Sequence, residues 1–265
     1  MELTNKVVIV TGGGNGIGAA LCRRFHREGA AKIVVADIDE NAARVVAEEI
    51  DGVAVRCNVG CEDDIAAVVD LTLKQFGRVD VFCSNAGITV KGGLESSNED
   101  WQRIWDVNVM SRLFAARKVI PQMLEQGGGY LIHVASAAGV LTEIGSASYS
   151  VTKHADVALA EWLSVCYGRE GIRVSCVCPL GVKTDMIDDE DPIHRYLHLH
   201  IITPDDVADA VVEGMKTERF LILPHPEVAE YFARKTNDYD QWLRGMQRLR
   251  QKLTRNRKRG QTDAA

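Results

Sequence analysis

The sequence predicts an α/β fold, a doubly wound parallel sheet with helices on both faces. Short apolar runs alternate with amphipathic helical stretches at least six times along the chain. The apolar runs are continuous and several are rich in Val and Ile, as expected for strands of a parallel sheet that are buried on both faces. Because no Pro/Gly/Ser-rich linker interrupts the alternation, we expect a single domain.

About seven strands are expected, one for each apolar run. These are Lys6–Val10, Lys32–Ala36, Val53–Arg56, Val79–Cys83, Tyr130–Ala135, Arg173–Cys178 and Phe220–Leu223. The expected helices are Ile17–Glu28, Glu40–Ile50, Glu62–Gln75, Trp101–Glu125, Tyr149–Gly168 and Pro204–Lys216. Gly29, Gly52, Gly77 and Gly171 stand near the ends of four helices, where a left-handed C-cap favours a residue without Cβ.

Composition and charge exclude several classes of protein. With 265 residues, of which 26% are charged and 46% hydrophobic, the chain has a globular composition. No run approaches the roughly 18 apolar residues that span a bilayer, and no secretory signal is visible, so we expect no membrane span. Seven cysteines without paired spacing indicate reduced thiols and a cytoplasmic location.

Charge is distributed unevenly. Residues 241–265 carry +7, so residues 1–240 carry -13. A body this acidic repels phosphates, and we expect no nucleic-acid partner. The basic tail is interpreted as a solvated helix, with binding to an anionic surface as the alternative.

The first strand is followed directly by the run Thr11-Gly12-Gly13-Gly14-Asn15-Gly16-Ile17-Gly18 and then by a helix. Glycines permit a tight turn and close approach of a phosphate, while the helix start offers unpaired N–H groups and a positive dipole end. A structural turn would explain the glycines alone, but their place between a strand and a helix predicts a nucleotide site. The expected cofactor-binding residues here are Gly12, Asn15, Gly16, Ile17 and Gly18.

Asp37 ends the second expected strand, 19 residues past Gly18. A carboxylate at this place accepts hydrogen bonds from ribose hydroxyls and repels a 2′-phosphate. Its neighbours Ala36 and Ile38 carry no positive charge that would reverse this preference. The sequence therefore predicts NAD as the cofactor, in preference to NADP.

The spacing Thr-Gly-x-x-x-Gly-x-Gly resembles that of the short-chain dehydrogenase/reductase family. The resemblance continues in Asn85-Ala86-Gly87 and in Asn58-Val59, although the family more often has Asp where Asn58 stands. It covers roughly residues 4–225. It implies a Rossmann-type catalytic domain over residues 1–225 and leaves residues 226–265 as a C-terminal helical extension with a basic tail.

Further cofactor contacts are implied by this resemblance. The family usually has Pro-Gly after the sixth strand, whereas here Pro179 is followed by Leu180 and then by Gly181-Val182-Lys183-Thr184. Val182 and Thr184 stand where the family holds the nicotinamide carboxamide. The cofactor-binding residues expected beyond the glycine turn are Asp37, Asn58, Val59, Asn85, Ala86, Gly87, Tyr149, Lys153, Pro179, Gly181, Val182 and Thr184.

Tyr149 and Lys153 open an expected helix, and residues four apart on a helix share a face. Free tyrosine has a pKa of about 10 and is a poor base at neutral pH. A nearby ammonium, helped by the positive charge of a nicotinamide, favours the phenolate. We therefore expect Tyr149 to have a lowered pKa and to serve as the catalytic acid and base.

Two more residues complete the expected catalytic set. Ser136 ends the fifth strand, and its hydroxyl would orient the oxygen of an alcohol or a carbonyl group. Asn108 matches the family's fourth catalytic residue, and the resemblance implies that it holds a water near Lys153. Each residue alone has an ordinary structural explanation, but their order after the nucleotide motif favours hydride transfer to or from a nicotinamide.

Residues of the family's substrate lid, about 185–200, are expected to set specificity. The residues expected to line an apolar pocket are Ile88, Val140, Leu141, Ile144, Leu180, Met186 and Ile187. They predict a small hydrophobic alcohol or ketone as substrate. His194, His198 and His200 include the spacing at which two histidines share a ligand face, but the mechanism needs no metal and none is expected.

Three functions stay open on the sequence. The favoured one is an NAD-dependent oxidoreductase acting on a hydrophobic secondary alcohol or ketone, and the second is a carbonyl reductase that works mainly toward the alcohol. The third, a non-catalytic nucleotide-sensing protein, should have lost Ser136, Tyr149 or Lys153, which are all present. The resemblance also implies a homodimer or homotetramer built through the helices Trp101–Glu125 and Tyr149–Gly168.

Overall fold

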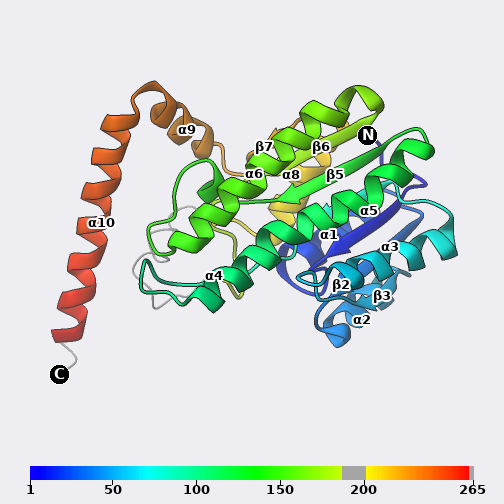
Figure 1. Ribbon diagram of the computed structural model, residues 1–265, viewed down its shortest axis with the longest axis horizontal. Coiled ribbons are helices and arrows are strands. Elements are labelled where there is room, and N and C mark those ends of the chain that lie inside the picture. Colours follow the sequence, from blue (N-terminus) through cyan, green and yellow to red (C-terminus); the bar gives the residue numbers. More distant parts are fainter. Residues whose placement is uncertain (187–200, 263–265) are drawn as a thin grey trace.

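Seven strands of the computed structural model form one parallel sheet (Figure 1), and the residues described are 1–186 and 201–262, without the side chains of 255–262. The strands are β1 (Val7–Thr11), β2 (Lys32–Asp37), β3 (Val53–Arg56), β4 (Val81–Ser84), β5 (Gly129–Val134), β6 (Ile172–Val177) and β7 (Leu221–Ile222). Their order is β3-β2-β1-β4-β5-β6-β7. It reverses between β1 and β4, where a doubly wound sheet opens a crevice at the carboxyl ends of its strands. The predicted fold class is confirmed.

Helices cover both faces of this sheet (Figure 1). One face carries α1 (Gly16–Arg27), α2 (Glu40–Glu49) and α8 (Pro204–Lys216), and the other carries α3 (Glu62–Phe76), α5 (Ser111–Glu125) and α6 (Ala147–Tyr167). Strand β1 serves both cores, because Val8 and Val10 pack on the first face while Ile9 packs on the second. Such alternation, with every position apolar, is why the strands read as continuous apolar runs.

The helix predicted at Trp101–Glu125 begins three residues earlier and contains a π-helical turn. It consists of α4 (Asn98–Trp105), a π-helical turn η1 (Asp106–Met110) and α5. The carbonyl of Val107 in this turn accepts hydrogen bonds from Ser111 Oγ at 2.5 Å and from Arg112 Nη1 at 2.8 Å. The predicted helix covers this range, but its π-helical turn was not predicted, because one wide turn alters the helical register by a single residue, which an apolar pattern over 25 residues does not reveal.

A second difference concerns the end of α2. Gly29, Gly77 and Gly171 take the left-handed conformation that was predicted, but after α2 it is Asp51 that does so, with φ 50°. Gly52 is needed for another reason, since a Cβ there would lie 2.7 Å from the carbonyl oxygen of Ile33 on β2. The glycine therefore permits close packing against the strand and does not cap the helix.

Beyond β7 the chain forms α9 (Glu227–Asn237) and α10 (Tyr239–Thr262), which leave the sheet and stand at its side (Figure 1). Two short 3₁₀ turns complete the described structure, η2 (Ala137–Gly139) after β5 and η3 (Gly168–Glu170) before β6. Within the described residues, no helix has the length and apolar character that a bilayer crossing requires.

Asp80 fastens the beginnings of β1 and β4 to each other. Its carboxylate is 2% exposed and accepts hydrogen bonds from the backbone N–H of Val7 at 2.9 Å and from the Arg78 guanidinium at 2.8 and 2.5 Å. We expect Asp80→Asn to lower the free energy of unfolding in urea by about 2 kcal/mol, the scale of hydrogen bonds to a charged group. Asp70→Asn, which removes an exposed partner of Lys118, is the control and should cost less than about 1 kcal/mol. Equal losses for the two variants would contradict this role.

Candidate active site

The glycine-rich turn lies at the carboxyl end of β1, where the strand order reverses. Gly12 and Gly16 have positive φ values of 63° and 51°. At Gly18 a Cβ would lie 1.9 Å from the carbonyl oxygen of Gly12, so the first turn of α1 can close on the loop only with glycine. Asn15 precedes α1 without a side-chain cap, which leaves the backbone N–H groups at this helix start for a ligand.

Asn85 and Thr11 join this turn to the end of β4. The Asn85 side-chain amide donates to the carbonyl oxygens of Thr11 and Gly12, both at 3.0 Å. In return, Thr11 Oγ1 accepts from the backbone N–H groups of Asn85 at 3.1 Å and Ala86 at 3.3 Å. The Asn85-Ala86-Gly87 segment therefore fixes the shape of the crevice as well as lining it.

Asp37 ends β2 as predicted. Its two carboxylate oxygens accept from the backbone N–H groups of Gly14 at 2.9 Å and Asp39 at 3.0 Å. A carboxylate has about four acceptor sites, so acceptor capacity for ribose hydroxyls is left. Asn58 and Val59 follow β3, the strand beside β2, where Asn58 Oδ1 accepts from the N–H of Gly60 at 3.1 Å.

Ser136, Tyr149 and Lys153 meet at the other end of the crevice. They line one cavity of about 310 Å³ together with Gly12, Asn15, Gly16 and Ile17 of the glycine turn. The Ser136 hydroxyl accepts from the backbone N–H of Ala138 at 3.1 Å and lies near enough to Tyr149 to lower its pKa. Lys153 Nζ donates to the carbonyl oxygen of Val134 at 3.0 Å and lies 5.6 Å from the centre of the Tyr149 ring.

Burial dominates the electrostatics of this pair. It raises the pKa of Tyr149 to about 12, and the Ser136 hydroxyl offsets only part of that rise. Burial also lowers the pKa of Lys153 to about 8, with the positive charge of Arg112 acting in the same direction. The expectation that Lys153 lowers the pKa of Tyr149 was therefore wrong for the chain's own groups, because desolvation of the phenolate outweighs the attraction of a buried ammonium.

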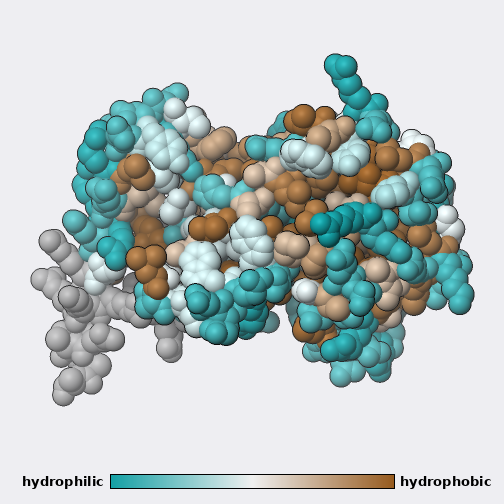
Figure 2. Space-filling model, in the orientation of Figure 1, coloured by the Kyte–Doolittle hydropathy of each residue, from teal (hydrophilic) through white to brown (hydrophobic). Residues whose placement is uncertain are grey.

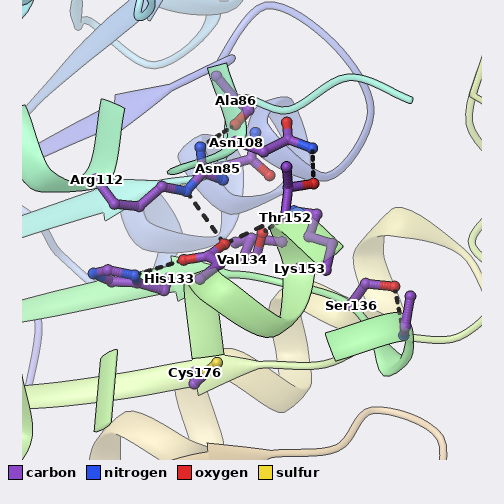
Figure 3. Close-up of polar contacts among 12 residues, drawn as sticks. Asn85, Ala86, Asn108, Arg112, His133, Val134, Ser136, Thr152, Lys153 and Cys176 are labelled. Atoms are coloured by element: carbon purple, nitrogen blue, oxygen red, sulfur yellow. Dashed lines mark hydrogen bonds and ion pairs between the residues drawn. The ribbon is translucent and has the colours of Figure 1, made fainter. Parts of the chain in front are cut away.

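Beside Lys153 lies a buried charged cluster that sequence reasoning missed, and Figure 3 shows its members Arg112 and His133. Asp156 Oδ1 accepts from His133 Nδ1 at 2.8 Å and Oδ2 accepts from Arg112 Nε at 3.2 Å, while Lys153 Nζ lies 3.9 Å from Oδ2. Arg112 and Asp156 are at most 1% exposed. Burial acts to raise the pKa of Asp156, but the charge of Arg112 and the hydrogen bond from His133 outweigh it and lower that pKa to about 2.

Asn108 is fully buried on the π-helical turn. Its Nδ2 donates to the carbonyl oxygen of Ile88 at 2.9 Å and to Thr152 Oγ1 at 3.2 Å, and its Oδ1 accepts from the N–H of Ile88 at 2.9 Å. A Cβ on Gly87 would lie 3.3 Å from Asn108 Oδ1 and 3.6 Å from Lys153 Nζ. The side chains of Asn108, on η1, and Lys153, on α6, therefore both lie close to Gly87.

His225, after β7, holds the segment that follows β6. Its Nε2 donates to the carbonyl oxygen of Gly181 at 3.1 Å, and its Nδ1 accepts from the N–H of Leu180 at 3.1 Å. The two bonds fix the imidazole as the Nε2–H tautomer. The segment Pro179-Leu180-Gly181 departs from the family's usual Pro-Gly. His225 binds its backbone at Leu180 and Gly181, which the sequence motif did not indicate.

The structure brings most of the predicted site residues together. The cavity at the glycine turn is lined by Gly12, Asn15, Gly16, Ile17, Asn85, Ala86, Gly87, Ser136, Tyr149, Lys153, Pro179, Leu180, Val182, Thr184 and Met186. It is also lined by Thr89, Lys91, Glu143 and Asp185, which the motifs did not single out. Glu143 and its neighbour Ile144 lie in the loop between η2 and α6.

Predicted substrate residues divide between two cavities. Leu180 lines both, Met186 lines the first, and Leu141 and Ile144 line a second one beside it. Ile88 and Val140 line neither cavity. The backbone of Ile88 is hydrogen-bonded to the Asn108 side chain, and the backbone of Val140 to the Lys235 ammonium. Ile187, His194, His198 and His200 lie outside the described residues, and the described residues contain no cluster of His, Cys, Asp and Glu that could hold a metal ion.

Comparison with known proteins agrees with this geometry. A family model described as short chain dehydrogenase matches residues 6–193. The meso-2,3-butanediol dehydrogenase of Serratia marcescens is 36% identical over 190 residues, covering 70% of this chain and 75% of that protein. The 1-deoxy-11-beta-hydroxypentalenate dehydrogenase of Streptomyces exfoliatus is 32% identical over 236 residues, covering 86% of each.

Solved structures agree as well. A short chain dehydrogenase/reductase from Burkholderia phymatum in complex with NAD has a TM-score of 0.83 and 29% identity, covering 91% of this chain and 96% of that one. A 7α-hydroxysteroid dehydrogenase complexed with NADH and 7-oxo glycochenodeoxycholic acid has a TM-score of 0.78 and 27% identity, covering 84% and 93%. The chain therefore belongs to the short-chain dehydrogenase/reductase family and is an oxidoreductase of that family.

Asp156→Asn should destabilise the fold by about 3 kcal/mol at pH 7, because it leaves the buried charge of Arg112 uncompensated. The pKa of Asp156 in the folded chain lies below its ordinary value, so its contribution is present above about pH 4 and is lost as the pH falls toward 2. The difference from the unchanged protein in urea unfolding should therefore shrink over that range. Glu161→Gln, on the exposed side of α6, is the matched control. A pH-independent difference would contradict the assignment.

Proposed function

We propose that the chain is an NAD-dependent oxidoreductase that transfers a hydride between a hydrophobic secondary alcohol or ketone and a nicotinamide. The observation that supports this best is the single cavity that joins the glycine turn to Ser136, Tyr149 and Lys153. NAD is favoured over NADP because Asp37 ends β2, and the Burkholderia phymatum relative in complex with NAD supports the same choice.

The residues of the crevice fit a dinucleotide. Gly12 and Gly16 keep the turn open to a pyrophosphate, which would lie against the N–H groups at the start of α1. Asp37 would bind the adenosine ribose, Asn58 and Val59 the adenine, and Val182 and Thr184 the nicotinamide carboxamide. When bound, the oxidised nicotinamide supplies the hydride acceptor and a positive charge in this cavity.

Tyr149 would move the proton of the reaction. Ser136 and Tyr149 line the same cavity, so one alcohol oxygen would contact both hydroxyls, with Ser136 holding the oxygen and Tyr149 taking its proton. Because burial raises the pKa of Tyr149, the phenolate depends on added positive charge. Within the chain, Arg112 lowers this pKa, and the ammonium of Lys153 lies 5.6 Å from the centre of the Tyr149 ring. Asn108 and Lys153 flank Gly87, which supports a water between them as the route by which the proton reaches solvent.

The direction of the reaction and the assembly belong to the same proposal. Oxidation of the alcohol is favoured, with a carbonyl reductase as the second candidate. We also propose a homodimer or homotetramer, supported by apolar side chains that α4 and α6 leave exposed: Trp105, Val151, Trp162 and Val165. All seven cysteines are free, which supports a reducing, cytoplasmic setting.

Tyr149→Phe tests the chemistry directly. The variant keeps the aromatic ring and loses the proton-transfer group, so we expect kcat to fall roughly 10²–10⁴-fold. The dissociation constant of NADH, measured by fluorescence titration, should change less than about threefold, which is under 1 kcal/mol. Tyr167→Phe, at the far end of the same helix, is the control. Turnover close to that of the unchanged protein would refute the role of Tyr149.

Asp37→Ser tests the choice of cofactor. Loss of the carboxylate removes the repulsion of a 2′-phosphate and the acceptor for the ribose hydroxyls, so the ratio of kcat/KM for NADP to that for NAD should rise roughly tenfold or more, about 1.4 kcal/mol. Glu40→Gln changes the same amount of charge three residues away and should leave the ratio as it is. If the unchanged protein already has a higher kcat/KM with NADP than with NAD, the proposed preference for NAD is wrong.

A further inference from the structure

A second cavity, of about 430 Å³, opens beside the catalytic one. Ser136, Glu143 and Leu180 line both cavities, so the second begins where the reacting oxygen would be held. From there it runs between two apolar walls. Leu141, Ile144 and Leu180 form the wall on the catalytic domain, and Trp242, Met246 and Leu249 form the wall on α10.

The wall on α10 is the apolar stripe of that helix. Trp242, Met246, Leu249 and Leu253 follow at spacings of four, three and four residues, which places them on one face. These four are partly or fully buried, whereas Leu243 on another face of the helix is 41% exposed. Figure 2 shows hydrophobic side chains among the hydrophilic ones on this side of the molecule, where Figure 1 places α9 and α10.

Lys235 of α9 fixes this wall to the catalytic domain. Its side chain is 5% exposed, and its ammonium donates to the carbonyl oxygens of Val140 at 2.8 Å and Leu141 at 3.0 Å. It also lies 3.4 Å from His154 Nε2, one residue past Lys153 on α6. A buried ammonium is tolerated only where such partners are supplied, so this contact defines where α9 docks.

The same ammonium positions Trp242. It lies 5.0 Å from the centre of the Trp242 ring and 5.5 Å from that of Tyr239, both at the start of α10. Cation–π contacts of this kind are strongest when the cation is desolvated, as it is here. Lys235 therefore ties the aromatic end of α10 to the loop that follows Ser136.

We propose that α9 and α10 form a specificity element, in which α10 binds the apolar body of the substrate and Lys235 is the positioning residue that holds it there. This rests on the proposed function. The substrate class is a secondary alcohol or ketone with one short arm and one large apolar arm, the large arm lying along Trp242, Met246 and Leu249. These helices follow the residues matched by the family model, which end at 193.

The test is oxidation of an alcohol series by the full chain with NAD, from 2-butanol to 2-decanol. Burial of each added methylene should raise kcat/KM by about fourfold while the chain extends along α10. Trp242→Ala should lower the ratio of kcat/KM for 2-decanol to that for 2-butanol at least tenfold, and Met246→Trp, which fills the cavity, should do the same. Leu243→Ala, the neighbouring exposed position, should keep the ratio of the unchanged protein. A ratio that is alike in all four proteins overturns the proposal.

Lys235→Met tests the positioning role, because it keeps the length of the side chain and removes its donors. It should raise KM for 2-decanol with little change in kcat, and Lys235→Arg should restore part of the loss. Combined with Trp242→Ala, it should lower the ratio no further than the stronger single change, since both act through one wall. Additive losses would show that Lys235 acts elsewhere.

Failure of the proposed function is distinguishable from failure of this inference. If the unchanged protein oxidises no alcohol of the series, the proposed function fails, and binding decides the inference. Calorimetric titration of 2-decanone into the NADH-loaded protein then either shows binding that Met246→Trp abolishes and Leu243→Ala keeps, which supports the element, or shows no such difference, which overturns it.

Discussion

The catalytic half of the molecule is organised around one buried carboxylate. Asp156 on α6 accepts from Arg112 on α5 and from His133 on β5, and it lies 3.9 Å from Lys153. A buried carboxylate is costly unless it is paired and hydrogen-bonded, so α5 and β5 are held against α6 by the Arg112 and His133 side chains that bind Asp156. The position of α6 against β5 in turn determines where Tyr149 and Lys153 lie in the cavity that the glycine turn also lines.

The strands were predictable because most of their residues are buried and apolar, as in β1 and β4. The bounds of β3 agree with the sequence pattern, and those of β2 differ by one residue, whereas β7 is shorter than its apolar run. The structure differs from the prediction where the backbone conformation depends on a residue distant in sequence or on hydrogen bonds within a turn. Gly52 is required by the nearby Ile33 carbonyl, and the π-helical turn at Asn108 is accompanied by hydrogen bonds from Ser111 and Arg112 to one freed carbonyl.

The candidate site divides in the same manner. Gly16, Tyr149 and Lys153 were found because their partners are close in sequence and the spacing itself carries the geometry. Arg112, His133, His225 and Lys235 bind partners 23 to 95 residues away, and nothing in their immediate sequence indicates the partner. The direction of the pKa shift of Tyr149 was missed for a related reason, because burial of a side chain is a property of the whole packed structure.

The contact made by Lys235 has an evolutionary consequence. Its ammonium binds the carbonyl oxygens of Val140 and Leu141, and every amino acid presents such an oxygen whatever its side chain. The loop after Ser136 can therefore exchange its side chains under selection without losing the anchor, while the lysine itself has no equivalent substitute. Drift in this lineage should leave position 235 constant and let the residues around it diversify, so that new pocket shapes arise on an unchanged attachment.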